Sequence, residues 1–182
     1  MRKTLTLLLT SFLFFNIPCY ASSLPDAEIS NKIGLGTGPS ISADFKVAPR
    51  VSLGGSLGSP FYRGFFTSGL YDVRLLYKFL DQGKFAFSGV IGVTGNPAFN
   101  GRFPGSLFGG EAGIALSYQF LPQLTGKLNL VGAFPVWTGV WSWFGNVSPA
   151  SGIELGYKFN NNFEVSLGGN GQGDFLGLNI YF

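Results

Sequence analysis

The chain has 182 residues, of which 12% are charged and 16% are aromatic, with 12 basic residues against 9 acidic ones and a net charge of +3 at pH 7. Soluble domains carry about twice this share of charged residues. The weak positive balance offers no basic field for nucleic acid, and the absence of histidine excludes Ser-His-Asp triads, Cys-His pairs and the usual histidine-based zinc sites.

The first residues have the pattern of a secretory signal peptide. Two basic residues precede an apolar stretch over 5–15, and Ala21 ends a cleavage site with small residues. The apolar stretch is too short to span a bilayer well, which favours a cleaved signal over a retained anchor helix. Cleavage after residue 21 removes Cys19, the only cysteine, so the mature chain has no disulfide. We expect a signal peptide over 1–21, a short periplasmic segment over 22–30 and one barrel domain over 31–182.

Beyond residue 30 apolar and polar residues alternate with a period of two almost everywhere. In residues 69–95, two alternating stretches flank the short turn Asp81-Gln82-Gly83-Lys84, which predicts a β-hairpin. Similar hairpins recur every 34–41 residues, and short turns alternate with longer loops. This pattern predicts an all-β, up-and-down antiparallel transmembrane barrel of eight to ten strands. We favour ten strands, at about 31–37, 40–46, 51–57, 69–79, 85–95, 108–120, 124–136, 151–159, 163–168 and 174–182.

Two details of the strand prediction stay open. Eight strands follow if the opening segment, 31–37, remains outside the sheet. The first two predicted strands are also shorter than the roughly 9–11 residues that a tilted membrane-spanning strand needs.

Two kinds of barrel fit such alternation. A soluble lipocalin-type barrel turns its apolar face inward, whereas an outer-membrane barrel turns it toward lipid. No predicted strand has a charge in the middle of its apolar face, and a lysine facing mid-bilayer lipid costs about 2–4 kcal/mol, so this separation favours the membrane barrel. Gly156 lies on the polar face, and we expect Gly156→Ala to have a mild effect on stable insertion of the barrel unless packing there is very tight. We expect the lumen to hold a paired, nearly neutral charge network of Asp44, Lys46, Asp72, Arg74, Lys78, Glu111, Lys127, Glu154, Lys158 and Glu164.

Aromatic residues gather at both ends of the predicted strands. Many precede or follow the short turns, and others lie in the longest loop. Aromatic girdles at two interfaces are typical of membrane barrels. We therefore expect the long loops 58–68, 96–106 and 138–150 to be extracellular. One interpretation of Trp137, Trp141, Trp143 and Phe144 is an extracellular aromatic surface. The alternative is that they form an aromatic girdle at the membrane interface or a cap over the lumen.

The chain ends with apolar residues at alternate positions, Leu178, Ile180 and Phe182. Together with the export signal and the repeated hairpins, this ending resembles that of the small outer-membrane β-barrels of diderm bacteria, of the type of the OmpA transmembrane domain and the opacity proteins. The resemblance implies that these three residues form the signal read by the barrel-assembly machinery. We expect a monomer in the cell outer membrane, in contact with lipid, without a nucleic-acid partner or a cofactor.

The resemblance also bears on catalysis. The outer-membrane enzymes of similar size or fold depend on an active-site histidine, which this chain lacks. We therefore expect no enzymatic activity and no catalytic, cofactor-binding or metal site, and we interpret the lumen carboxylates as salt-bridge partners. The main hypothesis is a non-enzymatic barrel with a structural or surface-interaction role. The alternatives are a narrow passive pore or carrier for a small solute, and a soluble periplasmic lipocalin-like carrier.

Overall fold

The computed structural model describes residues 24–37, 39–58, 70–95, 108–134, 148–171 and 174–182. Within these ranges no helix is long and apolar enough to cross a membrane. The described residues form ten strands: β1 (Lys32–Gly36), β2 (Ser40–Ala48), β3 (Val51–Gly58), β4 (Leu70–Gln82), β5 (Phe85–Gly95), β6 (Gly109–Leu121), β7 (Leu124–Phe134), β8 (Gly152–Lys158), β9 (Phe163–Asn170) and β10 (Leu176–Tyr181).

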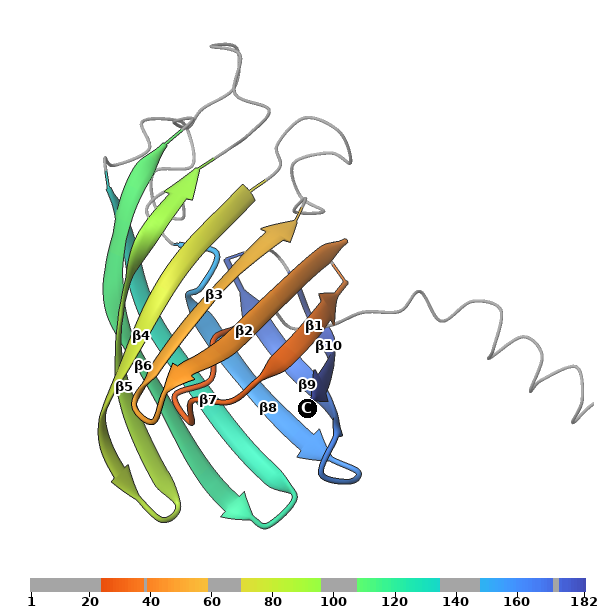
Figure 1. Ribbon diagram of the computed structural model, residues 1–182. Coiled ribbons are helices and arrows are strands. Elements are labelled where there is room, and N and C mark those ends of the chain that lie inside the picture. The colour runs from red at the N-terminus through yellow and green to blue at the C-terminus, as the bar shows by residue number, and fades with distance from the viewer. Residues whose placement is uncertain (1–23, 38, 59–69, 96–107, 135–147, 172–173) are drawn as a thin grey trace, which may run out of the picture.

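The ten strands form one closed antiparallel barrel (Figure 1). Each strand pairs with its neighbours in chain order, and β1 pairs with β10, so neither the first nor the last strand leaves an open edge. The prediction of an all-β, up-and-down barrel with ten strands is confirmed. The eight-strand alternative is wrong, because β1 is hydrogen-bonded to both β2 and β10. The predicted signal peptide lies outside the described residues.

Short turns close one end of the barrel, where β1 begins and β10 ends. In the β4–β5 turn, Gly83 has a φ of 63°, a left-handed conformation that glycine adopts without the clash of a Cβ. A register shift beside the β4–β5 and β6–β7 turns leaves Phe79 and Phe120 as bulged residues. Each ring lies over a glycine of the outer wall: a Cβ on Gly89 would lie 2.8 Å from Phe79, and one on Gly126 would lie 2.7 Å from Phe120. The glycines thus make room for aromatic rings near the short turns.

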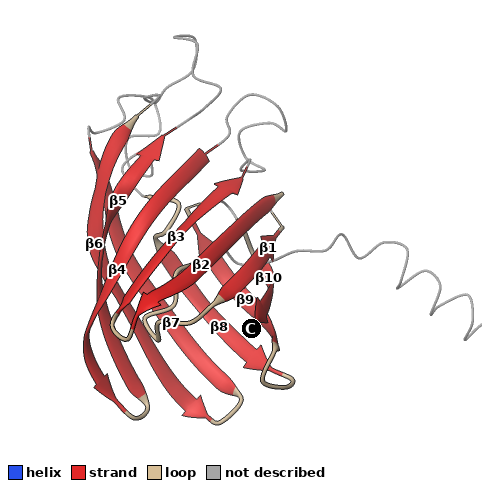
Figure 2. Cartoon of the chain, in the orientation of Figure 1, coloured by secondary structure: helices blue, strands red, loops and turns tan. Residues whose placement is uncertain are grey.

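The barrel wall is not of even height (Figure 2). Strands β4 to β7 have 11–13 residues each. Strands β8, β9, β10 and β1 have only 5–8 residues. The tall side of the barrel therefore lies opposite the side where the two ends of the sheet meet.

The two faces of the wall differ sharply in chemistry. Apolar side chains point outward, and examples from the middle of the wall are Leu75 (38% exposed), Ile91 (60%) and Leu130 (56%). In the middle of the wall, charged side chains point inward, including Arg74 (1% exposed) and Lys127 (2%). This arrangement is the reverse of that in a lipocalin-type barrel.

Candidate functional site

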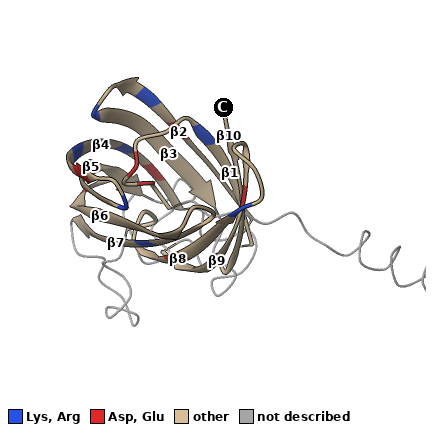
Figure 3. Cartoon of the chain, turned by 90° about the horizontal axis from the view of Figure 1, so that it is seen from below, with Lys and Arg blue, Asp and Glu red and all other residues tan. Residues whose placement is uncertain are grey.

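The barrel interior contains most of the charged side chains that the described residues bury, and Figure 3 shows from the short-turn end how the strands surround this lumen. Alternation along the sequence predicts a nearly neutral network, whereas acidic residues outnumber basic ones in the interior. The buried acidic residues are Asp26, Asp44, Asp72, Glu111, Glu154, Glu164 and Asp174, and the buried basic residues are Lys32, Arg74 and Lys127.

One ionic network joins β1, β2 and β4. The Arg74 guanidinium lies 2.6 Å from a carboxylate oxygen of Asp72 and 3.1 Å from one of Asp44. The ammonium group of Lys32 lies 3.7 Å from Asp44, and the hydroxyl of Ser56 donates a hydrogen bond to Asp72. Two cations face two carboxylates, so this network is balanced.

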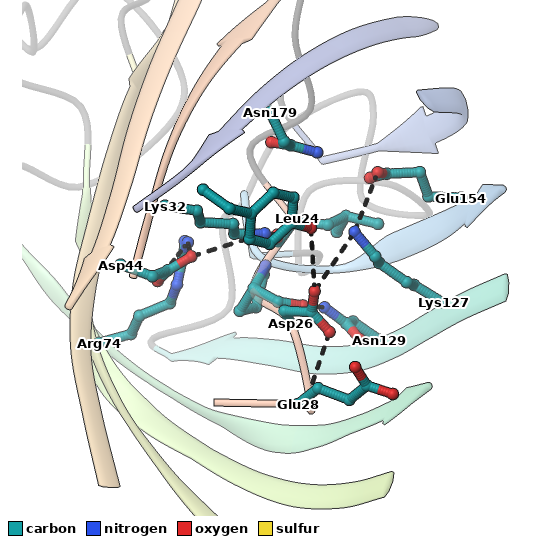
Figure 4. A network of polar contacts seen from close by, with 12 residues as sticks. Leu24, Asp26, Glu28, Lys32, Asp44, Arg74, Lys127, Asn129, Glu154 and Asn179 are labelled. Atoms are coloured by element: carbon teal, nitrogen blue, oxygen red, sulfur yellow. Dashed lines mark hydrogen bonds and ion pairs between the residues drawn. The ribbon is translucent and has the colours of Figure 1, made fainter. Parts of the chain in front are cut away.

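A second group of charges, the Lys127 cluster, is not balanced, and Figure 4 shows Lys127 with Asp26 and Glu154, two of its three carboxylates. The Lys127 ammonium lies 2.7 Å from Glu164, 3.5 Å from Asp26 and 3.6 Å from Glu154. Tyr181 donates a hydrogen bond of 3.1 Å to Glu164. One buried cation thus lies within 3.6 Å of three buried carboxylates, and we expect its positive charge to stabilise them inside the barrel.

Residues 24–30, called the inner segment below, lie inside the barrel (Figure 4). Three of its backbone carbonyl groups accept hydrogen bonds from side chains of the wall. Lys32 of β1 donates to residue 24 at 2.6 Å, Asn129 of β7 to residue 25 at 2.9 Å, and Ser88 of β5 to residue 27 at 2.9 Å. Because these donors come from separate sectors of the wall, the inner segment crosses the lumen.

The inner segment also supplies a carboxylate to the Lys127 cluster. Asp26 accepts hydrogen bonds from the hydroxyl groups of Ser117 (3.1 Å) and Tyr181 (3.3 Å). Burial acts to raise the pKa of Asp26, but the ammonium groups of Lys127 and Lys32 outweigh it and hold the pKa well below its ordinary value of 3.8. Asp26 is therefore ionised in the folded barrel at neutral pH.

This pKa shift predicts how Asp26→Asn changes stability with pH. A carboxyl group whose pKa is depressed by folding contributes stability above its unfolded pKa and loses it as the pH falls toward the folded value. We expect the variant to be less stable than the parent at neutral pH, and the difference to shrink as the pH falls below 3.8. Urea unfolding of parent and variant at neutral pH and at about pH 3 measures this change. A difference in stability that does not depend on pH would contradict the assignment.

Apolar side chains of the wall pack against the middle of the inner segment. Ala27 (0% exposed) and Ile29 (8%) belong to one buried cluster with inward side chains of β4, β5 and β6, among them Leu76, Val90 and Ala115. The lumen therefore combines a small apolar patch with the charged cluster. The sequence predicts a short periplasmic segment over 22–30, and residues 24–30 of it lie within the lumen.

A second stretch, residues 148–151, turns inward beside β7. The Ser148 hydroxyl donates to Glu111, and the Ser148 amide donates to the carbonyl of Val131 at 3.1 Å. The Val131 amide donates to the hydroxyl of Ser151 at 2.7 Å. This stretch therefore hydrogen-bonds to the part of β7 that extends beyond its pairing with β8.

The structure brings seven of the ten predicted lumen charges into the interior. Three others lie near the short turns: Lys46 is exposed, Lys78 is half-buried and paired with Asp81, and Lys158 lies 4.5 Å above the Tyr181 ring. Because these three cations lie at the rim, the interior is left acidic. The seven inside are Asp44, Asp72, Arg74, Glu111, Lys127, Glu154 and Glu164.

The predicted assembly signal lies on and just after β10. Leu178 and Ile180 pair with Leu35 and Ile33 of β1 across the closing seam of the barrel. Phe182 is 62% exposed, and its ring centroid lies 6.2 Å from that of Phe45. The predicted aromatic surface of Trp137, Trp141, Trp143 and Phe144 lies outside the described residues.

Several residues of the interior are absent from the network predicted from the sequence. Asn179 and Tyr181 alternate with the apolar residues of the last strand, so the period-two pattern could have placed them inside. Lys32 lay on the predicted polar face and could also have been included. Asp26 had no such signal, because the inner segment precedes the alternating pattern.

The wall is tightly packed where glycine faces inward. A Cβ on Gly156 would lie 2.7 Å from the carboxyl carbon of Glu164, so Gly156→Ala should push Glu164 away from Lys127. The mild effect expected from the sequence is therefore replaced by a predicted loss of about 1–3 kcal/mol in the free energy of unfolding. Urea unfolding measures the loss, with Gly110→Ala as the control because a Cβ there has no atom within 4 Å. Equal stability of both variants would contradict the prediction.

Within the described ranges no group of three or more histidine, cysteine, aspartate or glutamate residues is arranged to hold a metal ion. Comparisons of the chain with protein-family models, with curated proteins and with solved structures found no match.

Proposed function

We propose that the protein is a non-enzymatic β-barrel of the outer membrane of a diderm bacterium, with a structural or surface-interaction role. In this proposal, loops 58–68, 96–106 and 138–150 lie at the end of the barrel that faces the cell exterior and make its contacts. Residues 148–150 are the exception, because they are buried beside β6 and β7. The short turns and the start of β1 face the periplasm.

The observation that carries the proposal is the chemistry of the outer wall. Among the described residues, 29 large apolar or aromatic side chains are exposed, while the buried charges gather in the lumen. Soluble monomers rarely expose apolar patches beyond a few hundred Å², because such surfaces associate in water. A closed barrel with an apolar exterior is the form in which strands satisfy all their backbone hydrogen bonds within lipid.

Aromatic side chains at the two ends of the wall support the same proposal. At the short-turn end, three hairpins repeat one edge-to-face pair: Tyr77–Phe79, Tyr118–Phe120 and Tyr157–Phe159, with centroids 5.0–5.1 Å apart. At the opposite end, Phe108, Phe134 and Phe175 are each about 60% exposed. Aromatic rings at both borders of an aliphatic band match the two interfaces of a bilayer.

The inner segment within the lumen favours a structural or surface role over the narrow passive pore or carrier considered from the sequence. The inner segment crosses the interior and bonds to wall residues of β1, β5, β6, β7 and β10. The interior is also largely polar, whereas a lipocalin-like carrier requires an apolar cavity. Contacts through the outer loops remain as the proposed means of interaction.

Membrane fractionation and gel migration test the proposal. We expect the protein to stay with the membranes after an alkaline wash and to need detergent for extraction. Extracted protein should migrate differently on a gel before and after boiling, because a closed barrel resists unfolding by detergent alone. Release into buffer without detergent would contradict the membrane location.

A further inference from the structure

We propose that the inner segment is a removable plug, and that the barrel without it is a passage selective for small cations. The inference rests on the proposed membrane location and adds a latent transport path to it. Three features of the described residues support it: how the segment is held, what space it fills and which charges remain when it leaves.

The inner segment is held by hydrogen bonds from side chains of the wall and is not part of the sheet. The strand ladder begins at Lys32, after the segment ends. The wall reaches the segment through side-chain donors, which bind its carbonyl groups and the Asp26 carboxylate. Asn31, the next residue, is fixed to the barrel: its carbonyl accepts from the Phe182 amide and its side chain accepts from the Lys46 amide. The segment can therefore leave the lumen by a hinge at Asn31 without breaking a strand pair.

The segment also fills space that the wall leaves open. Inward positions on β1 and β10 include Gly34 and Gly177, which contribute no side chain to the lumen. Beside Leu24, one pocket between β8 and β9 has a volume of about 10 Å³, roughly the room for one water. Ten strands enclose more space than the eight whose interior side chains just fill a barrel. Withdrawal of seven residues would therefore open a substantial part of the interior.

The second inward stretch, 148–151, does not cross the lumen in the same way. Its hydrogen bonds go to β6, to β7 and to Gly171 just after β9. It lines the barrel beside β6, β7 and the end of β9.

The charges that remain after withdrawal favour cations. Removal of Asp26 leaves six buried carboxylates against Lys32, Arg74 and Lys127. Arg74 and Lys32 are neutralised by Asp44 and Asp72, so Glu154 and Glu164 outnumber Lys127 in the part of the lumen that the segment occupied. Carboxylate-lined constrictions select cations in channels.

Planar-bilayer recordings of the full chain and of a variant lacking residues 24–30 test the inference. We expect the full chain to be silent and the deletion variant to conduct, with K⁺ about tenfold or more preferred over Cl⁻. In the deletion variant, Glu154→Gln combined with Glu164→Gln should reduce this preference. A synthetic peptide with the sequence LPDAEISN, that of residues 24–31, should block the current, and the same peptide with asparagine in place of Asp26 should block it less.

Boiling-dependent gel migration separates failure of the inference from failure of the proposed function. A deletion variant that forms the heat-modifiable barrel but stays silent, or that prefers anions, overturns the plug. A full chain that conducts as well as the deletion variant overturns it too. If the deletion variant does not fold, Ser88→Ala combined with Asn129→Ala decides, because loss of these two donors to the carbonyl groups of residues 27 and 25 should release the intact segment and give cation-selective openings. Absence of these openings in the folded double variant overturns the plug, whereas a full chain that never enters membranes contradicts the membrane location itself.

Discussion

Lys127→Met is expected to lower the free energy of unfolding by about 3–5 kcal/mol, because it removes one partner from a buried ionic cluster. Methionine has a volume similar to that of lysine, so the loss of unfolding free energy measures the effect of the charge more than that of side-chain shape. Asp26, Glu154 and Glu164 would then remain buried beside one another without the ammonium group that lies within 3.6 Å of each. Urea unfolding of the detergent-extracted barrel, followed by gel migration without boiling, measures the change.

Two comparisons separate this electrostatic effect from a general sensitivity of the barrel. Lys158→Met changes a half-buried lysine near the short turns, and we expect a loss below about 1 kcal/mol. Adding Glu154→Gln to Lys127→Met should restore part of the stability, because it removes one of the uncompensated charges. Lys127→Met protein as stable as the parent would show that the three carboxylates do not need this cation.

The main features of the barrel could be predicted from the sequence because its strands obey a local rule. Alternation places Leu75 and Arg74 on opposite faces whatever the rest of the chain does, and turn residues such as Gly83 mark where a strand reverses. The strand predicted at 108–120 is observed at Gly109–Leu121, and the one predicted at 85–95 has the same bounds. Closure then follows, because β1 and β10 can satisfy their backbone groups only by pairing with each other.

The contents of the lumen could not be predicted in the same way. The inner segment lacks alternation, and its position depends on Ser88, Asn129 and Tyr181, which lie 61 to 155 residues further along the chain from their partners. The acidic balance of the interior was missed for a related reason. Alternation shows that Lys46 and Lys158 share the inward side of their strands, but not that they lie at the rim, where their side chains reach water.

Leu75→Lys is expected to prevent stable insertion, because a lysine facing mid-bilayer lipid costs about 2–4 kcal/mol. Leu75 lies on the outer wall between Leu53 of β3 and Ile91 of β5, so the new charge would have only apolar neighbours across the strands. Boiling-dependent gel migration of the membrane fraction measures the assembled share. Leu121→Lys is the matched control: this leucine is 57% exposed beside a short turn, where the cost falls to about 0–1 kcal/mol. If water surrounded the wall, Leu75→Lys would instead improve solubility and leave folding unchanged, so normal assembly of this variant would contradict a lipid-facing wall.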